Sequence, residues 1–262
     1  MELCNPEAGE STFLSEPRAR SGTDFLTADW VNLAMVNYEV DPSVLKGRLP
    51  AGTEIDTWDG KVFVSLVGFL FRRTKVLGMA IPFHREFQEV NLRFYVRHKD
   101  PTDGWKRGVV FVKEIVPRMA IALVARKVYG EPYVCLPMRH TFSDEGGTNG
   151  SLERVCYEWR FQGEWNRIKM NVSNRPFEAE PGSQEEFITE HYWGYSRARD
   201  GRSREYRVEH PRWKVWEASD CEVKCNTGEL YGKEFAEFLS GDPSSAFLAE
   251  GSPVIVHKAR TI

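Results

Sequence analysis

The sequence predicts a mainly β protein, folded as a barrel or a folded sheet system with a few packed helices. About ten short runs rich in Val, Ile, Phe, Tyr and Trp are separated by short turns, a pattern typical of all-β architectures. Only four segments carry helix signals. No linker divides residues 25–262, so we expect a single domain there. Residues 1–24 are polar and lack any period, which predicts a disordered N-terminal tail.

Composition narrows the class of partner. Lys and Arg number 35 against 38 Asp and Glu, giving a net charge of -3 in 262 residues, and this balance argues against a nucleic-acid partner. No run of eighteen apolar residues is present, so no membrane span is expected. The N-terminus lacks the apolar stretch of a secretory signal, which favours a cytoplasmic protein. Composition does not decide between a monomer and a homo-oligomer.

The clearest strand is residues 90–98. Val90, Leu92 and Phe94 alternate with Asn91, Arg93 and Tyr95, so the two sets face opposite sides of the sheet. The polar set would form a site if it faced inward and a solvated surface if it faced outward, and one strand cannot decide this. The other expected strands are 31–40, 61–71, 108–115, 133–138, 151–162, 164–172, 205–209, 214–223 and 253–259.

The helix signals are local. Asp41 is a typical N-cap followed by Pro42, which predicts a short helix to Leu49. Ser183 and Glu186 form a capping-box pattern before residues 187–192. Two further helices are expected over 228–239, from its apolar spacing, and over 117–129, with Gly130 after its end. Residues 141–151 contain three glycines and are the clearest loop.

One stretch combines a buried helix with charge. The seven residues from Met119 to Ala125 are all apolar, and Arg126 and Lys127 follow at once. A helix without a polar face is buried on all sides, so both cations lie close to the interior. They could stabilise the helix C-terminus through its dipole. Alternatively, desolvation and the neighbouring cation lower the pKa of Lys127 until the neutral amine attacks carbonyl groups to form a Schiff base.

The sequence also contains an aromatic cluster, at residues 191–195, and scattered residues of the types that bind metals. His191, Tyr192 and Trp193, with Tyr195 nearby, could floor a pocket for a small ligand or plug the end of a barrel. None of the six histidines lies four residues from another. Cys221-x3-Cys225 has no second Cys or His pair to complete four zinc ligands. We therefore expect neither a metal nor a cofactor.

Several motifs together resemble a known family. They are Trp30, Val40-Asp41-Pro42, Glu89–Val96 (EVNLRFYV), Arg107-Gly108-Val109, Ala125-Arg126 with Tyr129 and Pro132-Tyr133, and Thr189–Tyr192 (TEHY). The pattern resembles the YqjF-like family, domain of unknown function 2071, which is grouped with the acetoacetate decarboxylase-like superfamily. The resemblance implies a closed, mainly antiparallel β-barrel with helices packed outside and a cavity inside.

The resemblance also marks a site. The decarboxylases of the superfamily carry a Lys-Lys pair at the position matching Arg126-Lys127, so the first lysine is replaced here. Their substrate-holding Arg matches about Val31, so it is absent, and their helper Glu has no secure match, although Glu86 and Glu89 are close.

Two functions of different class follow, and a third remains open. The first is a small-molecule-binding barrel for an anionic or carbonyl-containing ligand. The second is a Schiff-base enzyme, a lyase or decarboxylase acting on a keto acid through Lys127, with Arg126 and Glu89 assisting. The third is a non-catalytic interaction module. The residues expected to bind the ligand are Asn91, Arg93, Tyr95, Tyr129, Tyr133, His191, Tyr192 and Trp193.

Overall fold

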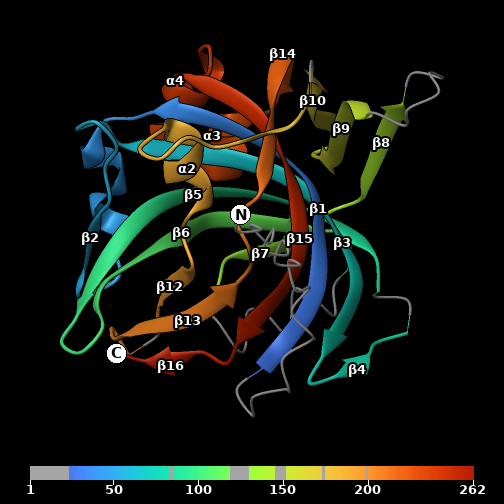
Figure 1. The fold of residues 1–262 in the computed structure, drawn as a ribbon. Coiled ribbons are helices and arrows are strands. Elements are labelled where there is room, and N and C mark those ends of the chain that lie inside the picture. Colours follow the sequence, from blue (N-terminus) through green and yellow to red (C-terminus); the bar gives the residue numbers. More distant parts are fainter. Residues whose placement is uncertain (1–23, 83–84, 119–129, 145–151, 173–174, 199) are drawn as a thin grey trace, which may run out of the picture.

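The computed structural model describes residues 24–82, 85–118, 130–144, 152–172, 175–198 and 200–262. The described chain is mainly β, as the sequence predicted, with a few short helices (Figure 1). The expected helix ending in Arg126, Lys127 and Tyr129 lies outside the described residues. Within the described part of the chain, no helix has the length and apolar character needed to cross a membrane.

The long strands pair in a ring. β13 pairs with both β12 and β15, so the path from β12 through β6, β5, β3, β1 and β15 returns to β13. The closed-barrel geometry itself stays a prediction. The bounds are β1 Asp24–Glu39, β3 Phe63–Val76, β5 Phe87–Asp100, β6 Gly104–Val116, β12 Trp193–Arg197, β13 Ser203–Glu209 and β15 Ser245–His257.

A second group of strands continues from β15 and covers one face of the first. β14 pairs with β15, and β10, β9 and β8 follow in order. Their bounds are β8 Met138–Asp144, β9 Leu152–Phe161, β10 Glu164–Val172 and β14 Lys214–Lys224. Five short strands lie at the edges: β2 Thr53–Ile55, β4 Met79–Ala80, β7 Tyr133–Cys135, β11 Phe177–Glu178 and β16 Arg260–Thr261.

The alternation predicted for β5 is confirmed. Val90, Leu92 and Phe94 belong to the larger core, together with apolar residues of β9 and β10. Phe87 and Tyr95 belong to a separate core cluster on the opposite face. The strand is thus buried on both faces, and its polar residues lie on the same face as the second cluster.

The pairings are mainly antiparallel, as expected, and two of those between described strands are parallel. β12 pairs with β6 at only two positions, Trp193 with Gly108 and Gly194 with Val109. Glycine is required at this seam, because a Cβ on Gly108 would lie 2.5 Å from the Trp193 carbonyl oxygen and one on Gly194 would lie 2.1 Å from the Tyr206 ring. The other parallel pairing joins β6 to β7.

The helices begin where the sequence predicted. The Asp41 side chain accepts a hydrogen bond from the Ser43 N–H at 2.7 Å and caps a 3₁₀ helix, η1 (Pro42–Arg48). Ser183 Oγ caps α2 (Gln184–Thr189) by accepting from the Glu186 N–H at 3.1 Å. Helix α2 ends three residues before the expected Tyr192.

The expected helix over 228–239 is divided in two. It forms α3 (Thr227–Tyr231) and α4 (Lys233–Ser240), because Gly232 between them has φ 118° and cannot continue a helix. Both helices contribute to the larger core. In contrast, α2 packs its apolar side against the second cluster, on the face of β5 that carries the polar residues.

Other differences concern strands. β1 begins at Asp24, seven residues before the expected start. Its first part was not predicted, because the strand is irregular near Asn32, which has φ 55°, and the register shifts between Val31 and Ala34. The expected strand over 133–138 is interrupted between β7 and β8, and β8 extends to Asp144, into the expected loop over 141–151. Strand β12 was missed, because its aromatic run was interpreted as a pocket floor or a plug.

Candidate functional site

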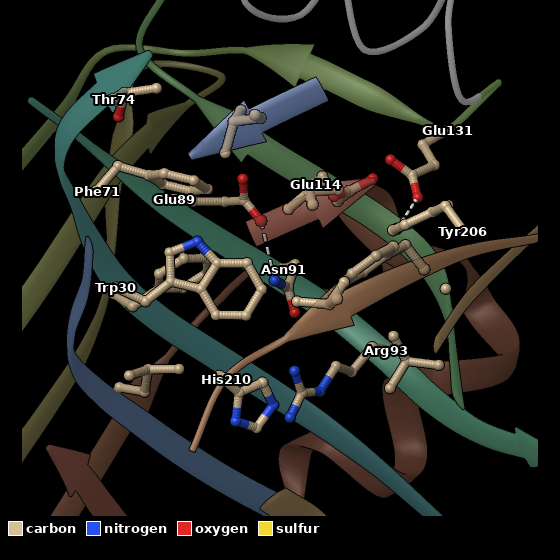
Figure 2. Close-up of a pocket in the computed structure, with 18 of the residues that line it drawn as sticks. Trp30, Phe71, Thr74, Glu89, Asn91, Arg93, Glu114, Glu131, Tyr206 and His210 are labelled. Atoms are coloured by element: carbon tan, nitrogen blue, oxygen red, sulfur yellow. Dashed lines mark hydrogen bonds between the residues drawn. The ribbon is translucent and has the colours of Figure 1, made fainter. Parts of the chain in front are cut away.

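The polar face of β5 opens into a cavity (Figure 2). The cavity has a volume of about 160 Å³. A single water needs roughly 10–15 Å³ of such space, so the cavity has room for a small organic molecule. Its walls come from β1, β3, β5, β6, β12 and β13, together with residues that precede β7, follow α2 and follow β13.

Aromatic side chains form one wall of the cavity. The Trp30 ring meets Phe69 edge to face with ring centroids 5.3 Å apart, and Phe71 stacks on Phe87 at 4.5 Å. His210 stacks on Trp213 at 4.1 Å and also lines the space. This wall provides an apolar surface for the carbon skeleton of a ligand.

A polar row crosses the cavity. Glu89, Asn91 and Arg93 alternate along β5 and all line it. Asn91 Nδ2 donates to Glu89 Oε1 at 3.0 Å. Arg93 is 9% exposed, its Nη2 lies 3.4 Å from the Ile188 carbonyl oxygen, and its Nε has no partner. Among the described residues, no carboxylate lies within the 4.0 Å ion-pair distance of this guanidinium. The inward orientation that the sequence left open is therefore the one that occurs.

Two further carboxyl groups lie beside Glu89. Glu114 comes from β6 and Glu131 from the segment before β7, and both are buried. The parallel pairing sets Glu114 opposite Tyr133, whose hydroxyl also donates to Glu89 Oε2 at 3.3 Å. The Tyr206 hydroxyl donates to Glu131 Oε1. We call Glu89, Glu114 and Glu131 the carboxyl cluster.

The pKa values of the carboxyl cluster are raised. Burial raises the pKa of Glu89 to about 7, against the opposing effects of hydrogen bonds from Asn91 and Tyr133 and of the Arg93 charge. Burial raises the pKa of Glu131 to about 8, although the Tyr206 hydrogen bond opposes it. Burial, with the charges of Glu131 and Glu89, holds the pKa of Glu114 well above its usual range. At neutral pH the cluster therefore retains protons and can donate as well as accept them.

His191 lies just after α2 and also lines the cavity. Its Nε2 lies 3.2 Å from Asp56 Oδ2, and its Nδ1 has no partner. Burial lowers the pKa of His191 to about 4, so the ring is neutral at pH 7. Because a carboxylate only accepts, Nε2 carries the hydrogen and Nδ1 is left as a free acceptor toward a ligand.

The structure brings together five of the eight expected ligand-binding residues. Asn91, Arg93, Tyr133, His191 and Trp193 line the cavity, and so does Glu89, the residue expected to assist catalysis. Tyr95 does not, because its hydroxyl bonds Ser65 Oγ at 2.5 Å and its ring packs against Phe187 and His191 beneath the cavity wall. Tyr192 does not either, since its hydroxyl donates to Glu190 and its ring packs on His210. Arg126, Lys127 and Tyr129 lie outside the described residues.

Sequence reasoning missed Glu114, Glu131 and Tyr206. Glu114 had a visible signal, because it is an acidic residue near the end of the otherwise apolar strand VVFVKEIV. Glu131 and Tyr206 had none, since only the tertiary fold brings them together.

The described side chains that could bind a metal ion do not lie together. Over the described ranges, no group of three or more His, Cys, Asp or Glu side chains is arranged to hold a metal ion. Cys221 and Cys225 are free thiols. Burial raises the pKa of each to about 12, so both remain protonated at neutral pH.

The fold is similar to those of several solved structures. An enduracididine biosynthesis enzyme, MppR, complexed with pyruvate, matches with a TM-score of 0.66 and 15% identity over 93% of this chain and 92% of that chain. Acetoacetate decarboxylase from Legionella pneumophila matches with a TM-score of 0.61 and 13% identity over 95% and 93%. An acetoacetate decarboxylase-like enzyme from Sphingomonas wittichii RW1 matches with 0.61 and 16% over 97% and 99%. At these identities the likeness shows an acetoacetate decarboxylase-like fold.

Sequence similarity identifies the family. The uncharacterized protein YqjF of Bacillus subtilis (strain 168) is 27% identical over 199 residues, which cover 76% of this chain and 77% of that protein. The family model DUF2071, described as an uncharacterized conserved protein, matches residues 27–253. The resemblance stated from the sequence motifs is thus confirmed, and the chain belongs to the DUF2071 family.

Proposed function

We propose that the cavity binds a small organic molecule through a carboxylate or another anionic group held by Arg93. The observation that carries this proposal is a buried guanidinium that has an unpartnered Nε and no ion pair among the described residues. Leaving such a charge unpaired is costly. A carboxylate satisfies it best, because two parallel N–H···O bonds match the planar guanidinium.

A carbonyl group in the ligand fits the rest of the site. Protonated Glu89 or Glu131 can donate a hydrogen bond to a carbonyl oxygen, and the aromatic wall can cover the attached carbons. One solved structure with this fold holds pyruvate, which is a small keto acid. The same likeness supports the inference that the ring of strand pairings is a closed barrel around the cavity.

Calorimetric titration tests the Arg93 assignment. Pyruvate and acetoacetate are the anionic probes, and pyruvamide is the uncharged match for pyruvate. We expect Arg93→Gln to weaken binding of the anions at least about tenfold, the effect of losing a charge-assisted hydrogen bond. Arg97→Gln is the matched control, because Arg97 lies on the same strand but is paired with exposed Glu54. The proposal is contradicted if Arg93→Gln binds the anions as tightly as wild type.

A second candidate is a Schiff-base enzyme acting on a keto acid. The raised pKa values of the carboxyl cluster favour it, because imine formation needs groups that donate and accept protons near neutral pH. No lysine is among the described residues that line the cavity, so Lys127 is the candidate nucleophile. Its amine would attack the carbonyl carbon, and the carbonyl oxygen would leave as water.

Borohydride trapping tests this candidate. Reduction of the imine would leave a stable secondary amine, detected by mass spectrometry on the peptide containing Lys127 and absent in Lys127→Met. Lys61→Met is the control, since Lys61 is half exposed and pairs with Glu39. If no keto acid gives an adduct at neutral pH, the enzyme is excluded and the binding function stands. If no small molecule binds at all, the interaction module is the remaining interpretation.

A further inference from the structure

We infer that the ligand also carries a cationic nitrogen, received by the carboxyl cluster while its carboxylate is held at Arg93. The carboxylate end rests on the proposed function. The cationic end adds a second recognition element and narrows the ligand to a class of small amino-carboxylates.

Three acceptor atoms of almost fully buried side chains line the cavity: Asn91 Oδ1, Glu114 Oε2 and His191 Nδ1. None has a hydrogen-bond partner among the described residues. Buried polar atoms nearly always have one. A simple keto acid brings only acceptors and would leave Asn91 Oδ1 and His191 Nδ1 unpaired. A ligand with N–H donors satisfies them.

Asn91 shows that the lack of hydrogen-bond donors is not confined to the acidic residues. It is a neutral side chain, 2% exposed, whose Nδ2 is already used by Glu89. Its Oδ1 is therefore free only to accept. In Figure 2 Asn91 lies between the Arg93 guanidinium and the carboxyl groups of the cluster. A ligand that extends from Arg93 to the carboxyl cluster would therefore pass Asn91 Oδ1 and could donate a hydrogen bond to it.

The carboxyl cluster also has no positively charged partner among the described residues. The hydrogen bonds recorded for Glu89 and Glu131 come from the neutral donors Asn91, Tyr133 and Tyr206. Among the described residues, no Lys, Arg or His nitrogen lies within 4.0 Å of any of the three carboxyl groups. An ammonium group would supply three donors and the positive charge that the described residues do not place beside the cluster.

The spacing along β5 suggests the length of the ligand. Glu89 and Arg93 are four residues apart on one face of the strand, which separates their Cα atoms by roughly 13 Å. Their side chains occupy part of this distance. A short unbranched skeleton would fill the rest and lie against the aromatic wall of Trp30 and Phe87. We therefore choose 5-aminopentanoate as the probe and pentanoate, which lacks only the amine, as its match.

The test is calorimetric titration at pH 7 in two buffers with different ionisation enthalpies. An arriving ammonium stabilises the charged form of Glu89, Glu114 and Glu131, so protons leave the cluster. We expect 5-aminopentanoate to bind at least about tenfold more tightly than pentanoate, with a heat that depends on the buffer. Pentanoate should release no protons. The inference is overturned if pentanoate binds as tightly, or if the heat for the amine does not depend on the buffer.

Variants separate the two ends of the site. Glu114→Gln should remove most of the advantage of 5-aminopentanoate over pentanoate, and Glu131→Gln serves if the first variant does not fold. Glu54→Gln, on an exposed pair with Arg97, should change the binding of neither ligand. If neither carboxylate binds to wild type, the proposed function fails. Propylammonium alone then decides the inference: binding with proton release keeps the cationic subsite, and no binding overturns it.

Discussion

Two groups of charged side chains in this fold differ in how they are paired. Lys106 on β6 is 4% exposed and reaches Asp100 at 2.6 Å, Asp103 at 3.0 Å and Glu205 at 3.7 Å. Arg260 near the C-terminus also pairs with Glu205. The cavity group has no such ion pair among the described residues. It consists of Arg93 and the carboxyl cluster, Glu89, Glu114 and Glu131.

The difference separates structure from function. The Lys106 group joins β6 to β13 and β16, and its charged groups form ion pairs with one another, although Glu205 Oε2 has no hydrogen-bond partner among the described residues. A network of ion pairs of this kind holds the elements that it joins in position. Among the described residues, the cavity group has no ion pair, which is the expected state of a site that binds a charged ligand.

The largest expected effect comes from breaking the paired group. Lys106→Met leaves Asp100 and Glu205 with less compensation at a buried site, so we expect the free energy of unfolding to fall by about 3–5 kcal/mol. Urea unfolding measures it. Lys61→Met, which breaks a half-exposed pair with Glu39, should cost no more than about 1 kcal/mol. Equal effects of the two variants would remove the structural role assigned to Lys106.

A smaller effect is expected where the backbone touches the cavity group. Gly194→Ala would place a Cβ against the Tyr206 ring and displace the hydroxyl that donates to Glu131. Overpacking of this kind costs about 1–3 kcal/mol, measured by thermal unfolding. Gly47→Ala is the control, because no atom lies within 4 Å of its added Cβ. A wild-type melting temperature for Gly194→Ala would mean that Tyr206 moves freely.

The carboxyl cluster predicts a pH dependence of stability. The pKa of Glu131 is raised in the folded protein from 4.5 to about 8. Between these values the folded state binds more protons than the unfolded state, so stability decreases as pH rises. One pKa unit corresponds to about 1.4 kcal/mol, so from pH 5 to pH 8 wild type should lose at least about that much relative to Glu131→Gln.

The control for the pH experiment is Glu54→Gln, because Glu54 lies in an exposed pair. Its unfolding free energy should follow that of wild type across the whole range. If the difference in unfolding free energy between wild type and Glu131→Gln were the same at every pH, Glu131 would titrate normally. That result would contradict a buried acidic subsite.

The smallest expected effect on stability belongs to Arg93. Because its charge has no ion pair among the described residues, Arg93→Met removes little that stabilises the fold. We expect the unfolding free energy to fall by no more than about 0.5 kcal/mol, or to rise. A loss as large as that of Lys106→Met would show that Arg93 is structural and that the two groups do not differ.

Much of the fold could be predicted from local pattern. The alternation in VNLRFYVRH gave both faces of β5, and Asp41-Pro42 and Ser183 gave the starts of two helices. These predictions were correct because each depends only on residues that are neighbours in the sequence. The division at Gly232 was missed, because periodicity over 228–239 is nearly continuous and only the backbone φ of 118° separates the two helices.

The site was predictable only in part. Glu89, Asn91 and Arg93 belong to one strand, so one correct orientation placed all three. Glu114 and Glu131 meet Glu89 through the parallel pairing of β6 with β7. Tyr206 arrives from β13, far along the chain. No local pattern encodes such pairings. Tyr95 was assigned to the cavity because it shares a face of β5 with Arg93, but Phe187 and His191 pack against its ring. Tyr192 was assigned because of its aromatic neighbours, which do not reveal where its side chain points.

The parallel seam between β12 and β6 has a consequence for how a ligand reaches the cavity. The two strands share two register positions, against eleven between β1 and β3. Trp193 at this seam lines the cavity. Its ring also packs against the Lys106 ammonium, whose Nζ lies 4.6 Å from the centre of the ring. Short ladders separate most readily in native proteins. We expect the amide hydrogens of β12 to exchange with solvent before those of β1 and β3, and a bound ligand to slow them.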